Sequence, residues 1–258
     1  MVKDLELAKQ VFSCIDNTTL NGTDNEAHVE AFCRHTMEMG QVAAVCVYPR
    51  FVSVARKTLE GSGIRVASVA GAFPHGQLPI ALKVDEVKYA AGEGADEIDM
   101  VLSRGALLAG EDNIVRDEVA VLKEACQGRT LKVILETGEL KTPDNIYIAS
   151  ILAMESGADY IKTSTGKTAV SATPEAVYVM CCAIRDYYKE TGEMVGLKPA
   201  GGISTTEDAL LYYTIVKDVL GEEWLNNDFF RLGASRLANA LLTDISKFDG
   251  KKKEIKYF

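Results

Sequence analysis

Short apolar runs alternate along the chain with longer segments of helical periodicity. The runs predicted to be β-strands span residues 42–47, 65–70, 97–102, 131–136, 160–163, 195–199 and 229–232. Their starts lie roughly 23 to 35 residues apart, the length of one strand–helix repeat. Between them, segments such as 112–126 and 174–190 carry apolar residues at the spacing of an amphipathic helix. The pattern therefore predicts alternating strands and helices.

The strands are apolar nearly throughout, which is typical of a parallel sheet covered by helices on its faces. Residues 14–16, after an expected N-terminal helix, would supply an eighth strand. Eight strands close a (β/α)8 TIM barrel, whereas seven would suit an open, doubly wound sheet. Neither a G-x-G-x-x-G nor a G-x-x-x-x-G-K-[ST] motif occurs, which weakens the nucleotide-binding form of the open sheet. We therefore predict a TIM barrel, with residues 1–258 forming one domain.

Composition narrows the class of protein. The net charge of −9 argues against a broad surface for nucleic acid or for anionic membranes. The six cysteines form no C-x-x-C pair and show no zinc-like spacing with histidine, so we expect neither a metal site nor a disulfide framework. There is no apolar leader and no apolar run of membrane length. We expect a cytoplasmic protein, and the pattern is compatible with a homodimer.

Three charged residues, Asp99, Lys162 and Lys198, interrupt strands that are otherwise apolar. Because side chains alternate between the two faces of a strand, apolar neighbours that pack against helices would turn all three toward the barrel interior. Catalytic groups of such barrels lie at the carboxyl ends of the strands. One lysine on a strand is commonly an ordinary paired charge. Three interruptions on three strands predict a single converging site.

These three residues supply the groups that a Schiff-base enzyme needs. A nucleophilic lysine must be neutral at the working pH, and both burial and a neighbouring ammonium lower its pKa below the usual ~10.4. A carboxylate can then carry protons to and from the atoms next to the bound carbonyl carbon, directly or through a water. The group predicts an enzyme that attacks a carbonyl compound with a lysine.

Three glycine-containing segments follow predicted strands near these lysines. They are Ala-Gly-Gly at 200–202, Gly-Ala-Ser at 233–235 and Thr-Gly-Lys at 165–167. The loops after the seventh and eighth strands of such barrels commonly bind phosphate through backbone N–H groups, and glycine lets the backbone approach an anion closely. Lys167 could reach the same phosphate or a substrate hydroxyl. The segments predict a phosphate pocket beside the lysines.

Eight segments resemble the deoxyribose-phosphate aldolases, class I aldolases built on a TIM barrel. They follow that family's order over about nine-tenths of the chain: IDNTTL (15–20), AVCVYPRF (44–51), FPHG (73–76), GADEIDMV (94–101), ETGEL (136–140), GADYIKTSTGK (157–167), GLKPAGGI (196–203) and RLGAS (231–235). YIKTSTGK and LKPAGG are highly specific, whereas GADEID and the glycine turns are less so alone.

The resemblance implies reversible cleavage of 2-deoxy-D-ribose 5-phosphate to acetaldehyde and D-glyceraldehyde 3-phosphate, in deoxyribose catabolism, without a metal or other cofactor. By position, Lys162 would form the Schiff base, Lys198 would lower its pKa, and Asp99 would act with a water in the proton transfers. Asp16 and Lys167 would orient substrate hydroxyls. The residues that would hold the phosphate are Gly166, Lys167, Gly201, Gly202, Gly233 and Ser235.

Three positions depart from that family's pattern. Ser204 stands where well-known members carry an arginine after the glycine pair, and Arg236 stands where they carry a second serine. We predict that the positive charge of the phosphate pocket has moved to Arg236. Some members use a C-terminal tyrosine in proton transfer. Here Tyr257 is only penultimate, so its role stays open.

Two more expectations and two alternatives complete the interpretation. Glu136, at the end of a strand, is predicted to be an ion-pair partner of Lys162 or Lys198, and Cys46 to be a small buried hydrophobic residue. A phosphate-binding barrel isomerase with a carboxylate base would share the glycine loops but would not need two lysines. A non-catalytic phosphosugar-binding protein would have lost the nucleophile. Both lysines occur together with Asp99, which favours the aldolase.

Overall fold

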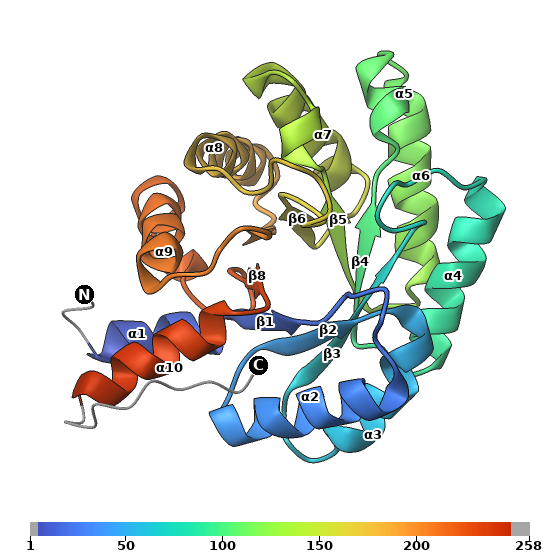
Figure 1. Ribbon diagram of the computed structural model, residues 1–258. Helices are drawn as coiled ribbons and strands as arrows, with labels where there is room; N and C mark the ends of the chain where they lie inside the picture. Colours follow the sequence, from blue (N-terminus) through green and yellow to red (C-terminus); the bar gives the residue numbers. More distant parts are fainter. Residues whose placement is uncertain (1–4, 249–258) are drawn as a thin grey trace.

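The computed structural model describes residues 5–248, in which eight parallel strands form a barrel inside a ring of helices (Figure 1). The strands are β1 (Ile15–Thr18), β2 (Ala44–Val47), β3 (Arg65–Ala70), β4 (Glu97–Val101), β5 (Thr130–Ile134), β6 (Tyr160–Lys162), β7 (Gly196–Lys198) and β8 (Leu232–Ala234). The helices are α1 (Leu5–Ser13), α2 (Glu26–Met39), α3 (Val52–Thr58), α4 (Ile80–Gly92), α5 (Arg104–Leu108), α6 (Asp112–Ala125), α7 (Pro143–Glu155), α8 (Pro174–Thr191), α9 (Thr206–Leu220) and α10 (Leu237–Phe248). The predicted TIM barrel is confirmed. Tyr257 lies outside the described residues.

Neighbouring strands pair in chain order, and β1 also pairs with β8. Between β7 and β8, the pairing is carried by two single bridges, Leu197 with Phe230 and Ala200 with Gly233. The backbone N–H of Arg231 donates to the carbonyl oxygen of Leu197 at 3.0 Å in the same place. These bonds close the ring of strands, so that side chains of every second residue face one interior.

The outward-facing residues of the strands form the main hydrophobic core together with the helices. Ile98, Ile161 and Leu197 are fully buried in this core. Each is followed on its strand by a charged residue, which must therefore point the opposite way, into the barrel. The burial of apolar outer faces thus dictates which charged side chains meet inside.

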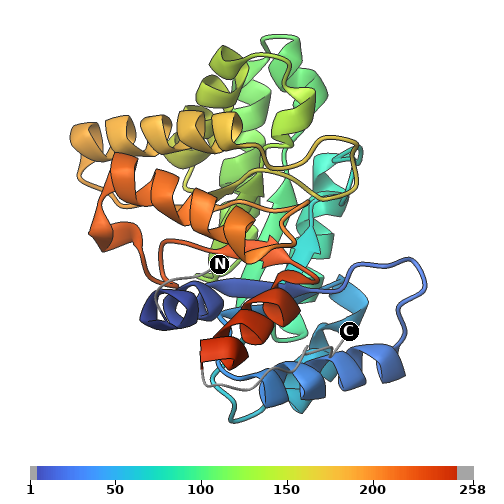
Figure 2. The same cartoon turned by 60° about the vertical axis from the view of Figure 1, so that its left-hand side comes forward.

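Threonine caps define where several helices begin after the strands. Thr142, Thr173 and Thr205 each accept a hydrogen bond from the backbone N–H three residues further on, at the starts of α7, α8 and α9. Both views show α8 and α9 running side by side (Figures 1 and 2). The caps fix the lengths of the loops after β5, β6 and β7.

The expected N-terminal helix is present as α1, which buries Ala8, Val11 and Phe12 and packs beside α10 (Figure 2). The first and last helices therefore complete neighbouring parts of the outer ring. Among residues 5–248, no helix is long and apolar enough to span a bilayer.

Strand boundaries differ from the predicted ones, most clearly in the last strand. It was predicted at 229–232, yet the pairing with β1 sets Ile15 opposite Leu232 and starts the strand there. The two phenylalanines before it pack against aromatic rings and pair with Leu197 of β7 rather than with β1. Gly233 therefore belongs to the strand, not to the turn after it. The first strand is also later than predicted. The strand predicted at 65–70 is found with those bounds, and the remaining strands differ from the prediction by one or two residues at one end or both.

The packing between β6 and β7 generates a stability prediction. A Cβ added at Gly196 would lie 2.3 Å from a ring carbon of Tyr160. We expect Gly196→Ala to lower the free energy of unfolding by about 1–3 kcal/mol, because a buried ring has to move. Gly92→Ala on α4 meets nothing within 4 Å and serves as the control, expected to be neutral or stabilising by up to ~1 kcal/mol. Urea unfolding measures both, and equal effects would contradict the packing argument.

Candidate active site

Asp99, Lys162 and Lys198 meet inside the barrel, near the carboxyl ends of β4, β6 and β7. Oδ2 of Asp99 lies 2.7 Å from Nζ of Lys162 and 2.7 Å from Nζ of Lys198. Asp99 and Lys198 are fully buried, and Lys162 is 4% exposed. The three residues that the strand pattern predicts to converge are thus in direct contact through one carboxylate oxygen.

Burial and neighbouring charges move the pKa values of these groups in different directions. Burial lowers the pKa of Lys162 most strongly, and the ammonium of Lys198 lowers it further, which together outweigh Asp99. Burial also acts to lower the pKa of Lys198, but the carboxylates of Asp16 and Asp99 outweigh it and the pKa rises. Burial opposes ionisation of Asp99, yet the neighbouring lysines hold its pKa well below the usual range. The arrangement favours one neutral amine beside an ammonium and a carboxylate.

A buried ion network that was not predicted from the sequence supports this trio. Lys132 on β5 donates to Asp99 at 3.0 Å and to Asp16 at 3.3 Å, and it also contacts Glu97. Arg231 donates to Asp16 at 2.6 Å and to Glu97 at 2.7 Å. All of these side chains are buried. Asp99, Lys162 and Lys198 are therefore in contact with a second group of paired charges, formed by Asp16, Glu97, Lys132 and Arg231.

The alternation of strand residues could have identified the network. Lys132 stands between Leu131 and Val133, and it lies opposite Asp99 in the strand register. Glu97 precedes Asp99 by two residues on β4 and shares its face. These are the same signals that singled out the catalytic candidates.

Asp16, which was predicted to orient a substrate hydroxyl, is fully engaged within the protein. Its carboxylate lies 2.5 Å from Nζ of Lys198 and also contacts Lys132 and Arg231. Burial works against its ionisation, but these three cations hold its pKa below the usual range. In this structure Asp16 stabilises the ammonium of Lys198. Its contact with a substrate stays a prediction.

A cavity of about 310 Å³ adjoins Lys162 at the carboxyl ends of the strands. All three predicted glycine segments line it. Ser204 and Arg236, which differ from the pattern of the deoxyribose-phosphate aldolases, line it as well. The lining includes Lys162, Gly166, Lys167, Gly201, Gly202, Ser204, Gly233, Ser235 and Arg236. The amine and the predicted phosphate loops therefore share one cavity. Binding of phosphate by these loops stays a prediction.

Two glycines allow the loops to approach closely at this cavity. A Cβ on Gly201, which has φ +82°, would lie 3.1 Å from Cα of Gly166 and 2.5 Å from a serine hydroxyl of the loop after β6. A Cβ on Gly233 would lie 2.8 Å from Cβ of Ala200 and 3.1 Å from Cε of Lys198. Side chains here would displace the loops and the buried lysine.

Two residues beside the cavity connect it to the first strands. Nζ of Lys167 donates to the carbonyl oxygen of Leu20 at 2.5 Å, which joins the loop after β6 to the loop after β1. Cys46, as expected, is a small and fully buried residue, packed with Leu20 and with small apolar side chains of β2 and β3. Leu20, which lines the cavity, therefore connects it to this small apolar cluster.

Glu136 does not pair with Lys162 or Lys198, so that prediction is wrong. β5 ends two residues before it, and Glu136 has the left-handed φ of 56°, which turns it toward the loop after β6. Its carboxylate accepts hydrogen bonds from the backbone N–H of Thr165 at 3.2 Å and from the hydroxyl of Thr168 at 3.2 Å. Glu136 therefore binds the loop after β6 and not the two lysines.

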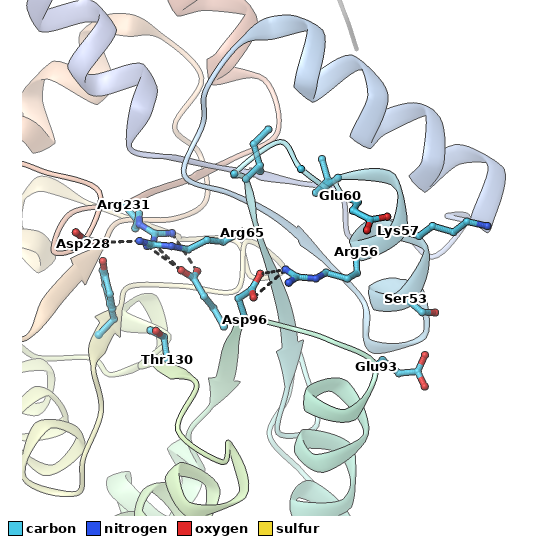
Figure 3. Close-up of a pocket in the computed structure, with 16 residues that line it drawn as sticks. Ser53, Arg56, Lys57, Glu60, Arg65, Glu93, Asp96, Thr130, Asp228 and Arg231 are labelled. Carbon is cyan, nitrogen blue, oxygen red and sulfur yellow. Dashed lines mark hydrogen bonds and ion pairs between the residues drawn. The ribbon is translucent and has the colours of Figure 1, made fainter.

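A larger cavity of about 840 Å³ lies at the opposite end of the barrel, where the strands begin (Figure 3). Four of its lining residues open successive strands: Arg65, Glu97, Thr130 and Tyr160. Its charged groups bind one another, since Arg65 contacts Asp228 at 2.7 Å and Arg56 contacts Asp96 at 2.9 Å (Figure 3). The candidate trio does not line it. Within residues 5–248, no group of three or more metal-ligating side chains is placed to hold a metal.

Known proteins resemble this chain along most of its length. Residues 10–222 match the model of the DeoC/LacD family aldolases. A candidate deoxyribose-phosphate aldolase of Caenorhabditis elegans is 46% identical over 242 residues, which cover 91% of this chain and 80% of that protein. The structure of a candidate deoxyribose-phosphate aldolase from Coccidioides immitis is 31% identical, with a TM-score of 0.77 over 89% of this chain and 85% of that one. The tetrameric deoxyribose phosphate aldolase of Aeropyrum pernix is 26% identical, with a TM-score of 0.74 over 96% of this chain and 100% of that one.

The lowered pKa of Lys162 predicts unusual reactivity. We expect reductive methylation by formaldehyde and cyanoborohydride to modify Lys162 with a pH midpoint below the ~10.4 of a free lysine, because only the neutral amine attacks. Peptide mass spectrometry across a pH series measures the midpoint. Lys189 on α8, with a side chain 67% exposed, is the internal control. A midpoint for Lys162 at or above that of Lys189 would contradict the electrostatic assignment.

Proposed function

The chain belongs to the DeoC/LacD family of aldolases, and on this premise we propose that it cleaves 2-deoxy-D-ribose 5-phosphate reversibly to acetaldehyde and D-glyceraldehyde 3-phosphate. The observation that carries the proposal is the contact of two lysines, Lys162 and Lys198, with one oxygen of Asp99. The reaction would serve the catabolism of deoxyribose. The similarity to candidate deoxyribose-phosphate aldolases supports the choice of substrate.

Lys162 is the proposed nucleophile. Among Asp99, Lys162 and Lys198, only Lys162 lines the cavity. The pKa of Lys162 is lowered, whereas that of Lys198 is raised. The neutral amine of Lys162 would attack the aldehyde carbon C1 of the substrate, and loss of water from the carbinolamine would leave an iminium ion. Lys198 would stay protonated and keep the amine neutral before the attack.

The iminium ion provides the driving force for carbon–carbon cleavage. The C3 hydroxyl would lose its proton through a water to the pair formed by Asp99 and Lys198. The C2–C3 bond would then break, and its electron pair would neutralise the iminium as an enamine while D-glyceraldehyde 3-phosphate leaves. Protonation of the enamine at C2 and hydrolysis of the imine would release acetaldehyde and restore Lys162.

The glycine loops are proposed to hold the phosphate. Gly166, Gly201, Gly202 and Gly233 border the same cavity as the amine. The backbone N–H groups of Gly201 and Gly233 donate to the carbonyl oxygens of Gly233 and Pro199, so those of Gly166 and Gly202 would be the donors to the phosphate. Lys167 and Arg236 would add positive charge. The cavity volume of about 310 Å³ suits a small phosphosugar. Homodimer formation, a cytoplasmic location and a single domain over residues 1–258 stay predictions.

Chemical trapping tests the reaction. Incubation with 2-deoxyribose 5-phosphate followed by borohydride should leave an adduct on Lys162, located by peptide mass spectrometry. We expect Lys162→Arg to form no adduct and to lose cleavage activity by on the order of 10³-fold or more, because its guanidinium stays charged. Lys189→Arg, a surface change on α8, is the matched control.

Other outcomes of that experiment would support other functions. Turnover retained in Lys162→Arg would favour an isomerase that uses a carboxylate base. Binding of the phosphosugar without any adduct or turnover would favour a non-catalytic binding protein.

Arg236 provides a separate test of the phosphate pocket. We expect Arg236→Ala to raise KM for the phosphorylated substrate about 10-fold or more, because a charged hydrogen bond is worth roughly 1.5–3 kcal/mol. Adding Ser204→Arg, at another residue that lines the same cavity, should restore much of the affinity. Steady-state kinetics of the single and double variants measure this. An unchanged KM in Arg236→Ala would contradict the prediction that Arg236 supplies the positive charge of the phosphate pocket.

A further inference from the structure

The loop between β6 and α8 brings three residues, Thr165, Gly166 and Lys167, into the lining of the cavity that Lys162 also lines. This loop has no helix or strand of its own. Its conformation must therefore be fixed by contacts with its neighbours, because an unrestrained loop would lose conformational entropy on every binding event.

The carboxylate of Glu136 makes such contacts on both sides of Gly166 and Lys167. It accepts hydrogen bonds from the backbone N–H of Thr165 at 3.2 Å and from the Thr165 hydroxyl at 2.5 Å. The hydroxyl of Thr168 lies 3.2 Å from the same carboxylate and 3.0 Å from the carbonyl oxygen of Val170, so it can donate to either. Thr165 and Thr168 immediately flank Gly166 and Lys167 in the sequence. One side chain thus holds the loop at its first cavity residue, Thr165, and directly after its last one, Lys167.

Glu136 occupies a position that is unfavourable in itself. A left-handed backbone is uncommon for residues other than glycine, and its φ is 56°. Its carboxylate is also fully buried, and a buried charge is costly unless it is paired. The positive partner is Arg104, whose Nη1 lies 3.6 Å away. Arg104 in turn binds Glu139 at 2.8 Å and the carbonyl oxygen of Pro74 at 3.2 Å. The loops after β3, β4, β5 and β6 are joined through these contacts.

A backbone contact supports the same arrangement. A Cβ added at Gly138, in the turn after β5, would lie 2.2 Å from the carbonyl oxygen of Val170. The turn therefore packs directly against the far part of the β6 loop. Glu136 and Gly138 together hold that loop at three points along its length, namely Thr165, Thr168 and Val170.

We propose that Glu136 is a positioning residue that fixes the β6 loop in the conformation that binds the phosphate end of the substrate. The inference rests on the proposed function. It adds that the enzyme's preference for a phosphorylated substrate depends on Glu136. Glu136 contacts the loop and not Lys162, whose position is set by β6 and by Asp99. Loss of its carboxylate should therefore weaken recognition of the phosphate and leave the chemistry of the amine in place.

Glu136→Gln tests the proposal with two measurements on the same protein. The first is KM for 2-deoxyribose 5-phosphate, which we expect to rise on the order of 10-fold, because charged hydrogen bonds to the loop are lost. The second is the rate at which acetaldehyde, which carries no phosphate, is trapped on Lys162 by borohydride. We expect that rate to stay within about 2-fold of the unmodified protein, since Glu136 touches no reacting atom.

Two further variants make the test specific. Glu139→Gln removes the other carboxylate bound to Arg104 without touching the β6 loop, and it should leave both measurements unchanged. Thr168→Val removes one contact of Glu136 at a residue outside the cavity lining, and it should raise KM in the same direction as Glu136→Gln. It also keeps the proposal testable if Glu136→Gln fails to fold.

The outcomes separate this proposal from the function on which it rests. Equal losses in KM and in trapping, or an unchanged KM in the folded variants, would overturn the positioning role. Failure of the unmodified protein to form any adduct on Lys162 would overturn the aldolase mechanism instead.

Discussion

The balance of charge inside the barrel is the constraint on which the candidate site depends. The buried carboxylates are Asp16, Glu97 and Asp99, and the buried cationic groups are Lys132, Lys162, Lys198 and Arg231. Each charge removed from water costs several kcal/mol unless it is paired. With every lysine protonated, the interior would hold one positive charge more than its carboxylates balance. Lys162 contacts Asp99 alone among these carboxylates, so it can lose its proton at the least cost.

The same network extends between the two ends of the barrel. At the start of the strands its charges bind one another, and we call this the structural end; at the carboxyl ends of the strands Lys162 lines the smaller cavity, and we call this the chemical end. Arg231 and Glu97 lie toward the start of the strands, beside Arg65 and Asp228 and the larger cavity (Figure 3). Lys132 links this end to Asp99, because it contacts both carboxylates of β4. Lys132 thus helps to keep Asp99 ionised without lining the cavity beside Lys162. The chemical end is left with one amine that has a single carboxylate partner.

Apolar strands and their polar interruptions could be predicted because burial dictates both, and alternation sets the direction of a residue such as Asp99. The limits of that rule explain the errors. Glu136 lies beyond the end of β5 with a left-handed backbone, so alternation no longer fixes its direction. The apolar residues before β8 satisfy the strand pattern while packing on aromatic rings. Lys132 follows the same rule, since it stands between Leu131 and Val133 and points into the barrel toward Asp99.

The amine and the proposed phosphate site are coupled because one short segment carries both. β6 ends at Lys162, and Gly166 and Lys167 follow within the next five residues. Between them, the hydroxyl of Thr163 accepts from the backbone N–H of Ala200 at 2.9 Å and lies 3.2 Å from its carbonyl oxygen. This ties the end of β6 to the glycine loop after β7. The spacing between the strand that carries Lys162 and the glycine loop is therefore set by these contacts, an arrangement that would place an aldehyde carbon at Lys162 if the proposed site holds the phosphate.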